Sequence, residues 1–202
     1  MTQRVERPYD AEVEYLESSG GAIGPRIKTD YIPNVQDIDI EFGWMPLGYR
    51  DNSAWVSYFT AYTDENTKTY RVIRDGSTNG AGVRIYNGDL AKGGGTTPIL
   101  KFNEKNNLIM YGATRTRTLN GVDGTLQAYS DTNNTNTLFI GHPKTEQRIY
   151  SFKLWEEGKL ILDLIPVRKD GIGYLYNKAD GKLYGNTSED NDIEFILGPD
   201  LA

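Results

Sequence analysis

Polar and apolar residues alternate along several short stretches of this chain. The clearest are residues 36–45, where apolar side chains occupy every second position from Ile38 to Trp44, and residues 148–155. A period of two is that of a half-buried β-strand, because successive side chains of a strand point to opposite faces of a sheet. Both stretches therefore predict strands with one face in a core.

Turn signals separate such stretches at short intervals. Asn120-Gly121 is a strong two-residue hairpin signal, and Gly181 supplies a positive φ to the turn at 177–182. No ten-residue stretch has helical periodicity, and Pro46 and Pro166 are predicted to end strands. The remaining strands are expected at 11–16, 27–32, 54–63, 69–74, 83–86, 99–102, 107–111, 115–119, 124–128, 137–141, 160–167, 173–176, 183–184 and 193–197. This pattern predicts an all-β fold, a two-sheet antiparallel β-sandwich.

The length and composition suit one large β domain. The chain has 202 residues, 38% of them hydrophobic, with 14 tyrosines against 6 phenylalanines. A chain of this size buries about 70% of its unfolded surface, which is enough for a sizeable core. We predict a polar N-terminal arm at residues 1–10 and a single sandwich domain at 11–202.

Charge and cysteine content exclude several classes of function. The net charge is −6 and no segment is strongly basic, so we predict no nucleic-acid partner. Arg115 and Arg117 are interpreted as a solvated strand edge. There is no cysteine, which excludes disulfides and thiol chemistry. No apolar run approaches the roughly 20 residues that a membrane helix needs, so we predict no membrane insertion.

The last quarter of the chain resembles a known family. Residues 147–200 contain RIYSFK, IPVR, LYNK, GKL and FILGPD in that order, and EVEYLESSG stands at 12–20. These segments resemble the laminin-G-like modules of the concanavalin A-like lectin superfamily, found in gut bacterial surface proteins and in their bacteriophages. The sequence at 21–30, GAIGPRIKTD, departs from the TQYIDTG of the family. The resemblance implies a concanavalin A-like sandwich in jelly-roll order, a fold that hosts lectins, hydrolases and structural modules.

Residues 37–41 read DIDIE, which places Asp37, Asp39 and Glu41 on one face of a strand. Hydrolases of the laminarinase type carry E-x-D-x-E on such a strand, with the first Glu as nucleophile and the last as acid/base. The resemblance therefore makes these three carboxylates the candidate catalytic residues. Asp37 is shorter than the Glu of that motif, which works against the roughly 5–5.5 Å carboxyl separation of a retaining pair. A solvated outer face is the favoured interpretation, so we predict no enzymatic activity.

Aromatic residues cluster in the first third of the chain. An apolar platform beside a few fixed polar groups is typical of a glycan site. About half of such aromatics are expected in the core of a sandwich instead. Trp155 is predicted to pack under its hairpin. The predicted ligand-binding residues are Trp44, Trp55, Tyr58, Tyr62, Asp51 and Asn52.

No metal site or other cofactor is predicted. Loop carboxylates and amides around Asp51, Asp64 and Asp131 offer oxygen ligands for calcium, the alternative we keep open, but none has a defined spacing. The only histidine, His142, cannot build a zinc site alone and is expected to end the strand at 137–141. The glycine-rich segment at 93–97 lacks the features of a phosphate loop.

These features together predict a non-enzymatic bacteriophage virion module that adheres to glycans, on the capsid or the tail. The start of the chain, MTQRVERPYD, has no apolar segment of a signal peptide, which favours assembly into a virion. The arm at 1–10 would dock on other virion subunits, and the module could also form a homo-oligomer. The alternatives are an adhesion module of a gut bacterial surface protein and a glycoside hydrolase.

Overall fold

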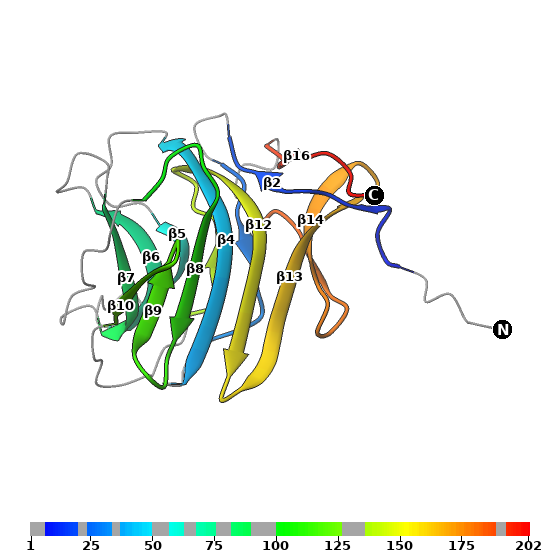
Figure 1. Cartoon of the computed structure of the whole chain (residues 1–202). Helices are drawn as coiled ribbons and strands as arrows, with labels where there is room; N and C mark the ends of the chain where they lie inside the picture. Colours follow the sequence, from blue (N-terminus) through cyan, green and yellow to red (C-terminus); the bar gives the residue numbers. More distant parts are fainter. Residues whose placement is uncertain are drawn as a thin grey trace.

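The structure of the chain is a computed structural model that describes nine ranges of residues: 7–19, 24–33, 37–49, 57–62, 68–75, 82–89, 100–126, 136–188 and 193–202. Within these ranges the side chains at 49, 62, 68–71, 73–75 and 82–89 are left undescribed. The described part contains strands and turns but no helix, arranged as two antiparallel sheets (Figure 1). The predicted all-β sandwich is confirmed, and the jelly-roll order stays a prediction.

The larger sheet carries the strands that the family resemblance covers. Its order is β10-β9-β8-β4-β12-β13-β14-β15, and in addition β1 pairs with β13, β2 with β12, and β16 with β2. Its strands are β1 (Ala11–Glu12), β2 (Leu16–Glu17), β4 (Ile38–Tyr49), β8 (Asn106–Tyr111), β9 (Thr116–Leu119), β10 (Val122–Thr125), β12 (Thr145–Glu156), β13 (Lys159–Lys169), β14 (Ile172–Asn177), β15 (Leu183–Tyr184) and β16 (Ile196–Leu197). Because β4 pairs with both β8 and β12, it lies in the middle of this sheet (Figure 1).

The smaller sheet follows the order β3-β11-β5-β6-β7 and lies behind the larger sheet in the view of Figure 1. Its strands are β3 (Ile27–Lys28), β5 (Ser57–Tyr62), β6 (Lys68–Asp75), β7 (Gly82–Asp89) and β11 (Phe139–Ile140).

A single hydrophobic core fills the space between the sheets. It runs from Val13 to Phe195 along the chain and includes residues of both layers. At its centre the ring of Phe42 stacks on Trp44 at 4.7 Å and meets Phe59 and Phe152 edge-on. Aromatic pairs of this kind add about 0.5–1.5 kcal/mol each beyond the area that they bury.

The first residues of the domain pair with two different partners. Residues 11–16 were predicted as one strand, but β1 pairs with β13 and β2 pairs with β12 and β16. The change of partner between Glu12 and Leu16 breaks the strand in two. Tyr9 and Asp10 were predicted to belong to the arm, yet Tyr9 packs on Tyr176 at 4.9 Å and Asp10 bonds to the main chain of β13.

Both prolines that were predicted to end strands lie inside strands. Pro46 sits in β4 beside a register shift of β12, and its carbonyl oxygen accepts a bond from Asn103 N. Pro166 sits in β13, and its carbonyl oxygen accepts a bond from Val13 N. A strand tolerates proline at bulges and wherever no N–H is needed. The predicted strand ends at 45 and 167 are therefore wrong.

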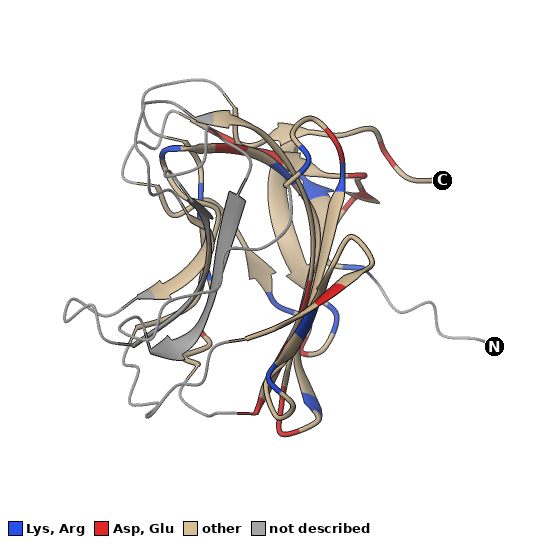
Figure 2. Cartoon of the chain, turned by 60° about the vertical axis from the view of Figure 1, so that its left-hand side comes forward, with Lys and Arg blue, Asp and Glu red and all other residues tan. Residues whose placement is uncertain are grey.

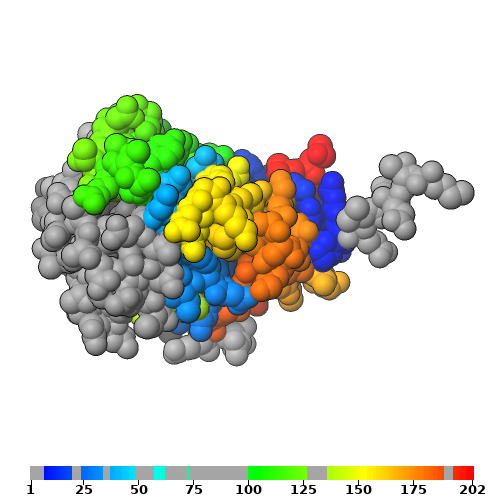
Figure 3. Space-filling view, turned by 90° about the horizontal axis from the view of Figure 1, so that it is seen from below, coloured from blue at the N-terminus to red at the C-terminus, as the bar shows by residue number. Residues whose placement is uncertain are grey.

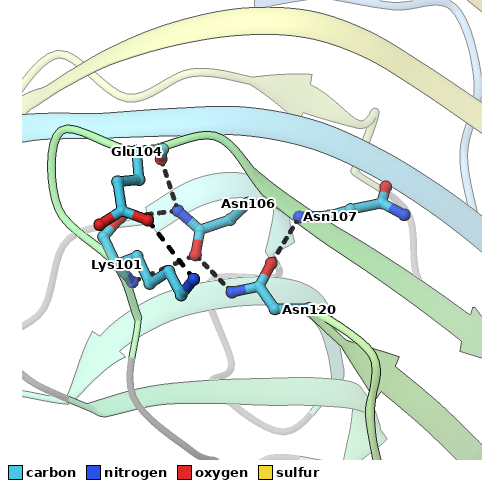
Figure 4. A network of polar contacts seen from close by, with 5 residues as sticks. All are labelled: Lys101, Glu104, Asn106, Asn107 and Asn120. Carbon is cyan, nitrogen blue, oxygen red and sulfur yellow. Dashed lines mark hydrogen bonds and ion pairs between the residues drawn. The ribbon is translucent and has the colours of Figure 1, made fainter.

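The described part of the predicted strand at 99–102 is not a strand, and the side chain of Asn106 explains why (Figure 4). The side-chain oxygen Oδ1 of Asn106 accepts a hydrogen bond from Lys101 N at 3.1 Å, and the side-chain nitrogen Nδ2 donates one to Lys101 O at 2.7 Å. The same side chain donates to Glu104 O and accepts from Asn120. The main chain at Lys101 thus bonds to a side chain rather than to a neighbouring strand.

The predicted turn residues adopt the conformations that their types favour. Asn120 and Gly121 have φ values of 52° and 80° and connect β9 to β10 as a tight hairpin. Gly181 has a φ of 81° in the turn after β14. A left-handed pair such as Asn120-Gly121 matches the twist of antiparallel strands.

Candidate functional site

Alternation along β4 places two carboxylates, those of Asp39 and Glu41, on the outer face of the larger sheet. Ile38, Ile40 and Phe42 are buried between the sheets, with at most 1% of each exposed. The side chains between them are half-buried and point to the opposite face, toward solvent. The predicted outward face is confirmed for Asp39 and Glu41, whereas Asp37 is half-buried and precedes the strand.

Strand register brings two aromatic residues next to Asp39. Trp155 of β12 is its direct partner across the β4–β12 pair. On the other side, β8 pairs Ile40 with Met110, so the next step of the register sets Tyr111 beside Asp39. Side chains at such paired positions have Cβ atoms about 4.5–5.5 Å apart. Asp39 therefore lies between an indole and a phenol ring contributed by its two neighbouring strands.

A groove with a volume of about 230 Å³ runs over these positions. Glu41 of β4 and Gly158 of the turn after β12 also line it. The lining residues are Asp39, Ile40, Glu41, Ile109, Met110, Tyr111, Trp155 and Gly158. Seen from below, the start of β4 lies between the green segment after β8 and the yellow turn between β12 and β13 (Figure 3), and the lining residues come from the start of β4, the end of β8, and the end of β12 with its turn.

The two carboxylates of the groove differ in their protein partners. Glu41 Oε2 lies 3.8 Å from Lys153 Nζ, in a solvated pair of the kind that contributes little to stability. Asp39 Oδ1 accepts a hydrogen bond from Gly112 N at 2.9 Å. Within the described ranges, no cationic side chain pairs with Asp39. The groove therefore contains a carboxylate, that of Asp39, with no cationic partner among the described side chains.

The acidic and basic positions of the described chain lie mainly along the larger sheet and its turns (Figure 2).

In chemical terms, the groove offers two aromatic side chains and two carboxylates that accept hydrogen bonds. Tyr111 is 43% exposed, whereas Trp155 is half-buried, and both residues line the groove. The aromatic faces are suited to contacting a small ring or a cation of a ligand, while the carboxylates bind the polar groups of that ligand.

The aromatic residues predicted to bind a ligand are placed differently. Trp44 and Tyr58 are fully buried, with ring centroids 5.7 Å apart in the core. A ligand on the surface cannot stack on either ring, so this part of the predicted site is wrong. Trp55, Asp51 and Asn52 lie outside the described residues, and Tyr62 lies in β5 with its side chain undescribed.

Trp155 was predicted to pack under a hairpin and instead faces the groove. The pairing of β12 with β13 shifts register between Leu154 and Trp155, beside the turn that follows. Along β12, Phe152 and Leu154 are buried, so Lys153 and Trp155 share the outer face. The alternation of the sequence contained this signal, because Trp155 has the parity of Lys153 and not that of Leu154.

Arg117 was predicted to be solvated at a strand edge, but it is only 7% exposed. It alternates with two outward threonines of β9, which turns it to the inner face, and its Nη1 has no hydrogen-bond partner. Burial lowers the pKa of its guanidinium. Arg115 precedes the strand and is exposed as predicted.

Nothing in the described ranges resembles a metal centre, since they hold no group of three acidic, histidine or cysteine side chains close together. His142 follows β11, and its Nδ1 accepts a hydrogen bond from Lys144 N at 3.1 Å, so it lies in the turn that ends the strand. No helix long and apolar enough to cross a membrane occurs among the described residues.

A second cluster on the outer face lies near β2. Arg148 Nε donates to Glu17 Oε2 at 2.6 Å, and its guanidinium stacks over Tyr15 at 4.3 Å. Lys105 lies 4.4 Å above the ring of Tyr150. Because each charged group already contacts a protein partner, this cluster fastens β2 to β12 and offers no open site.

Comparison of the chain with protein-family models and with curated proteins found no match.

Proposed function

We propose that this chain is a non-enzymatic module that adheres to glycans through the groove on the outer face of the larger sheet. The observation that carries the proposal is the placement of Trp155 and Tyr111 on either side of Asp39. Sugar rings present apolar C–H faces to aromatic rings and hydroxyl groups to carboxylates. A groove of about 230 Å³ has room for one such ring.

The rigidity of the site supports this proposal. The three strands that supply the groove are paired along most of their length, and β4 alone is bonded to β12 over eleven residue pairs. Sites on paired strands lose little conformational freedom when they bind, so weak stacking contacts are not cancelled by ordering costs.

The setting that we propose is the surface of a bacteriophage particle, on the capsid or tail, with other virion subunits as partners. The resemblance of residues 147–200 to modules of gut bacteria and their phages supports it. A gut bacterial surface protein is the alternative setting. Co-sedimentation of the chain with phage particles from an infected culture would support the first, and its recovery only from the bacterial envelope would support the second.

A glycan-array screen of the purified protein tests the adhesion itself. The wild type is compared with Trp155→Ala, and Tyr174→Ala, a half-buried tyrosine of β14 outside the groove, is the matched control. We expect binding to one class of glycan, weakened at least about tenfold in Trp155→Ala and unchanged in Tyr174→Ala. Equal binding by both variants, or no binding by the wild type with or without calcium, would refute the proposal.

The same glycans serve to test for hydrolysis. Products are followed by chromatography after long incubation of the bound glycan with wild type and Glu41→Gln. We expect intact glycan in both samples. Cleavage that disappears in Glu41→Gln would instead establish a hydrolase using the carboxylates of β4.

A further inference from the structure

The groove contains a negative charge that no described side chain neutralises. Asp39 is half-buried, its Oδ1 is held by Gly112 N, and among the described residues no lysine or arginine pairs with it. Lys153, a cation of this face, pairs with Glu41, the next outward-facing residue along β4. A partly desolvated carboxylate costs free energy unless an opposite charge approaches it.

The rings on either side of Asp39 also favour a cation. Trp155 and Tyr111 belong to strands on opposite sides of β4, so their α-carbons stand about two strand spacings apart, roughly 9.5 Å. This leaves room for one ammonium group within about 6 Å of both rings, the range of a cation–π contact. Two aromatic side chains and a carboxylate therefore line the same part of the groove.

We propose that the groove selects glycans that carry a protonated amino group, such as a de-N-acetylated amino sugar, over neutral and N-acetylated glycans. This inference rests on the proposed function and adds the chemical class of the ligand. The ammonium group lies between Trp155 and Tyr111 and pairs with Asp39, while the sugar ring stacks on the indole. An acetyl group removes the charge and adds bulk at the same nitrogen, and a hydroxyl removes the charge alone.

Three tetrasaccharides with the same β-1,4 linkage separate these contributions. They carry a free amine, an acetamide or a hydroxyl at C2, and their dissociation constants are measured by calorimetry in mildly acidic buffer, where the amine is protonated. We expect the free amine to bind at least about tenfold more tightly than the other two. Added salt should weaken the binding of the amine and leave that of the hydroxyl compound unchanged.

Two variants assign the preference to Asp39. Asp39→Asn keeps an oxygen that can accept from Gly112 N but removes the charge, so the amine should lose its advantage and bind like the hydroxyl compound. Asp123→Asn, on the same outer face outside the groove, removes an equal charge and should keep the advantage. Circular dichroism and the urea midpoint of Asp39→Asn confirm that it is folded.

The outcomes separate this inference from the adhesion proposal. Equal binding of the three tetrasaccharides, lost in Trp155→Ala, would overturn the charge preference and leave adhesion standing. If the protein binds other glycans of the array but none of the three tetrasaccharides, the charge preference is likewise overturned and adhesion still stands. Tetralysine that binds as tightly as the amine would show that the groove reads charge on a peptide, which also overturns the inference. No binding of any glycan would overturn both proposals.

Discussion

Replacement of Asn106 by alanine should destabilise the whole domain, because this side chain organises three separate segments. Asn106 is fully buried at the start of β8 and makes four hydrogen bonds, two with the main chain of Lys101 and one each with Glu104 O and Asn120 Nδ2 (Figure 4). Alanine removes all four and leaves the amide and carbonyl groups of Lys101 without these partners.

The expected cost follows from these bonds. A buried hydrogen bond contributes a net of about 1 kcal/mol, so four bonds amount to about 4 kcal/mol. Water that enters the vacated space would recover part of this, which leaves a loss of about 3 kcal/mol. Set against the roughly 5–15 kcal/mol of a typical domain, this is a large effect for one polar side chain.

Urea unfolding followed by circular dichroism measures this loss as a lower midpoint at an unchanged slope. The neighbouring Asn107 is the matched control, since its side chain is exposed and only its main-chain nitrogen and carbonyl oxygen bond to Asn120. Asn107→Ala should change stability by less than about 0.5 kcal/mol. A loss below about 1 kcal/mol in Asn106→Ala, or equal losses in both variants, would refute the reasoning.

Three further predictions concern stability. Arg148→Ala removes the ion pair with Glu17 and the stacking on Tyr15, so urea unfolding should show a loss of about 1–2 kcal/mol, and an unchanged midpoint would contradict this. Burial raises the pKa of Tyr31 in the folded state above its ordinary 10.0, so the proton is lost on unfolding and stability should fall as pH rises above 10. Tyr31→Phe should flatten that decline, and an identical pH profile would argue against it. Gly198→Ala would bring a Cβ within 2.8 Å of Tyr15 N, so thermal unfolding should show a loss of about 1–3 kcal/mol rather than a gain.

The face on which each side chain of β4 lies could be predicted from the sequence. Alternation placed Asp39 outward, and the same parity places Trp44 with Phe42 in the core, although the clustering of aromatics suggested a ligand platform there. Parity was the stronger signal, because a strand cannot turn one side chain to the other face without a shift of register. By the same parity, Trp155 of β12 lies on the outer face with Lys153.

The neighbours of Asp39 could not be predicted in this way. Tyr111 and Trp155 reach it because β8 and β12 both pair with β4, and this pairing follows from the topology of the sheet and from the bulges of β12. Nothing in the local pattern of the three segments fixes which strands become neighbours. The absence of a strand at Lys101 could not be predicted for a similar reason. The side chain of Asn106, five residues further along the chain, takes the main-chain hydrogen bonds of Lys101.

The most direct test of the groove is the response of the tryptophan indole N–H signals to a glycan in a nuclear magnetic resonance titration. The chain has three tryptophans, and Trp155→Phe assigns the signal of the groove. The account predicts that the free-amine tetrasaccharide shifts the Trp155 signal in a saturable manner and leaves that of the buried Trp44 in place. A bound tetrasaccharide that leaves the Trp155 signal unmoved would contradict it.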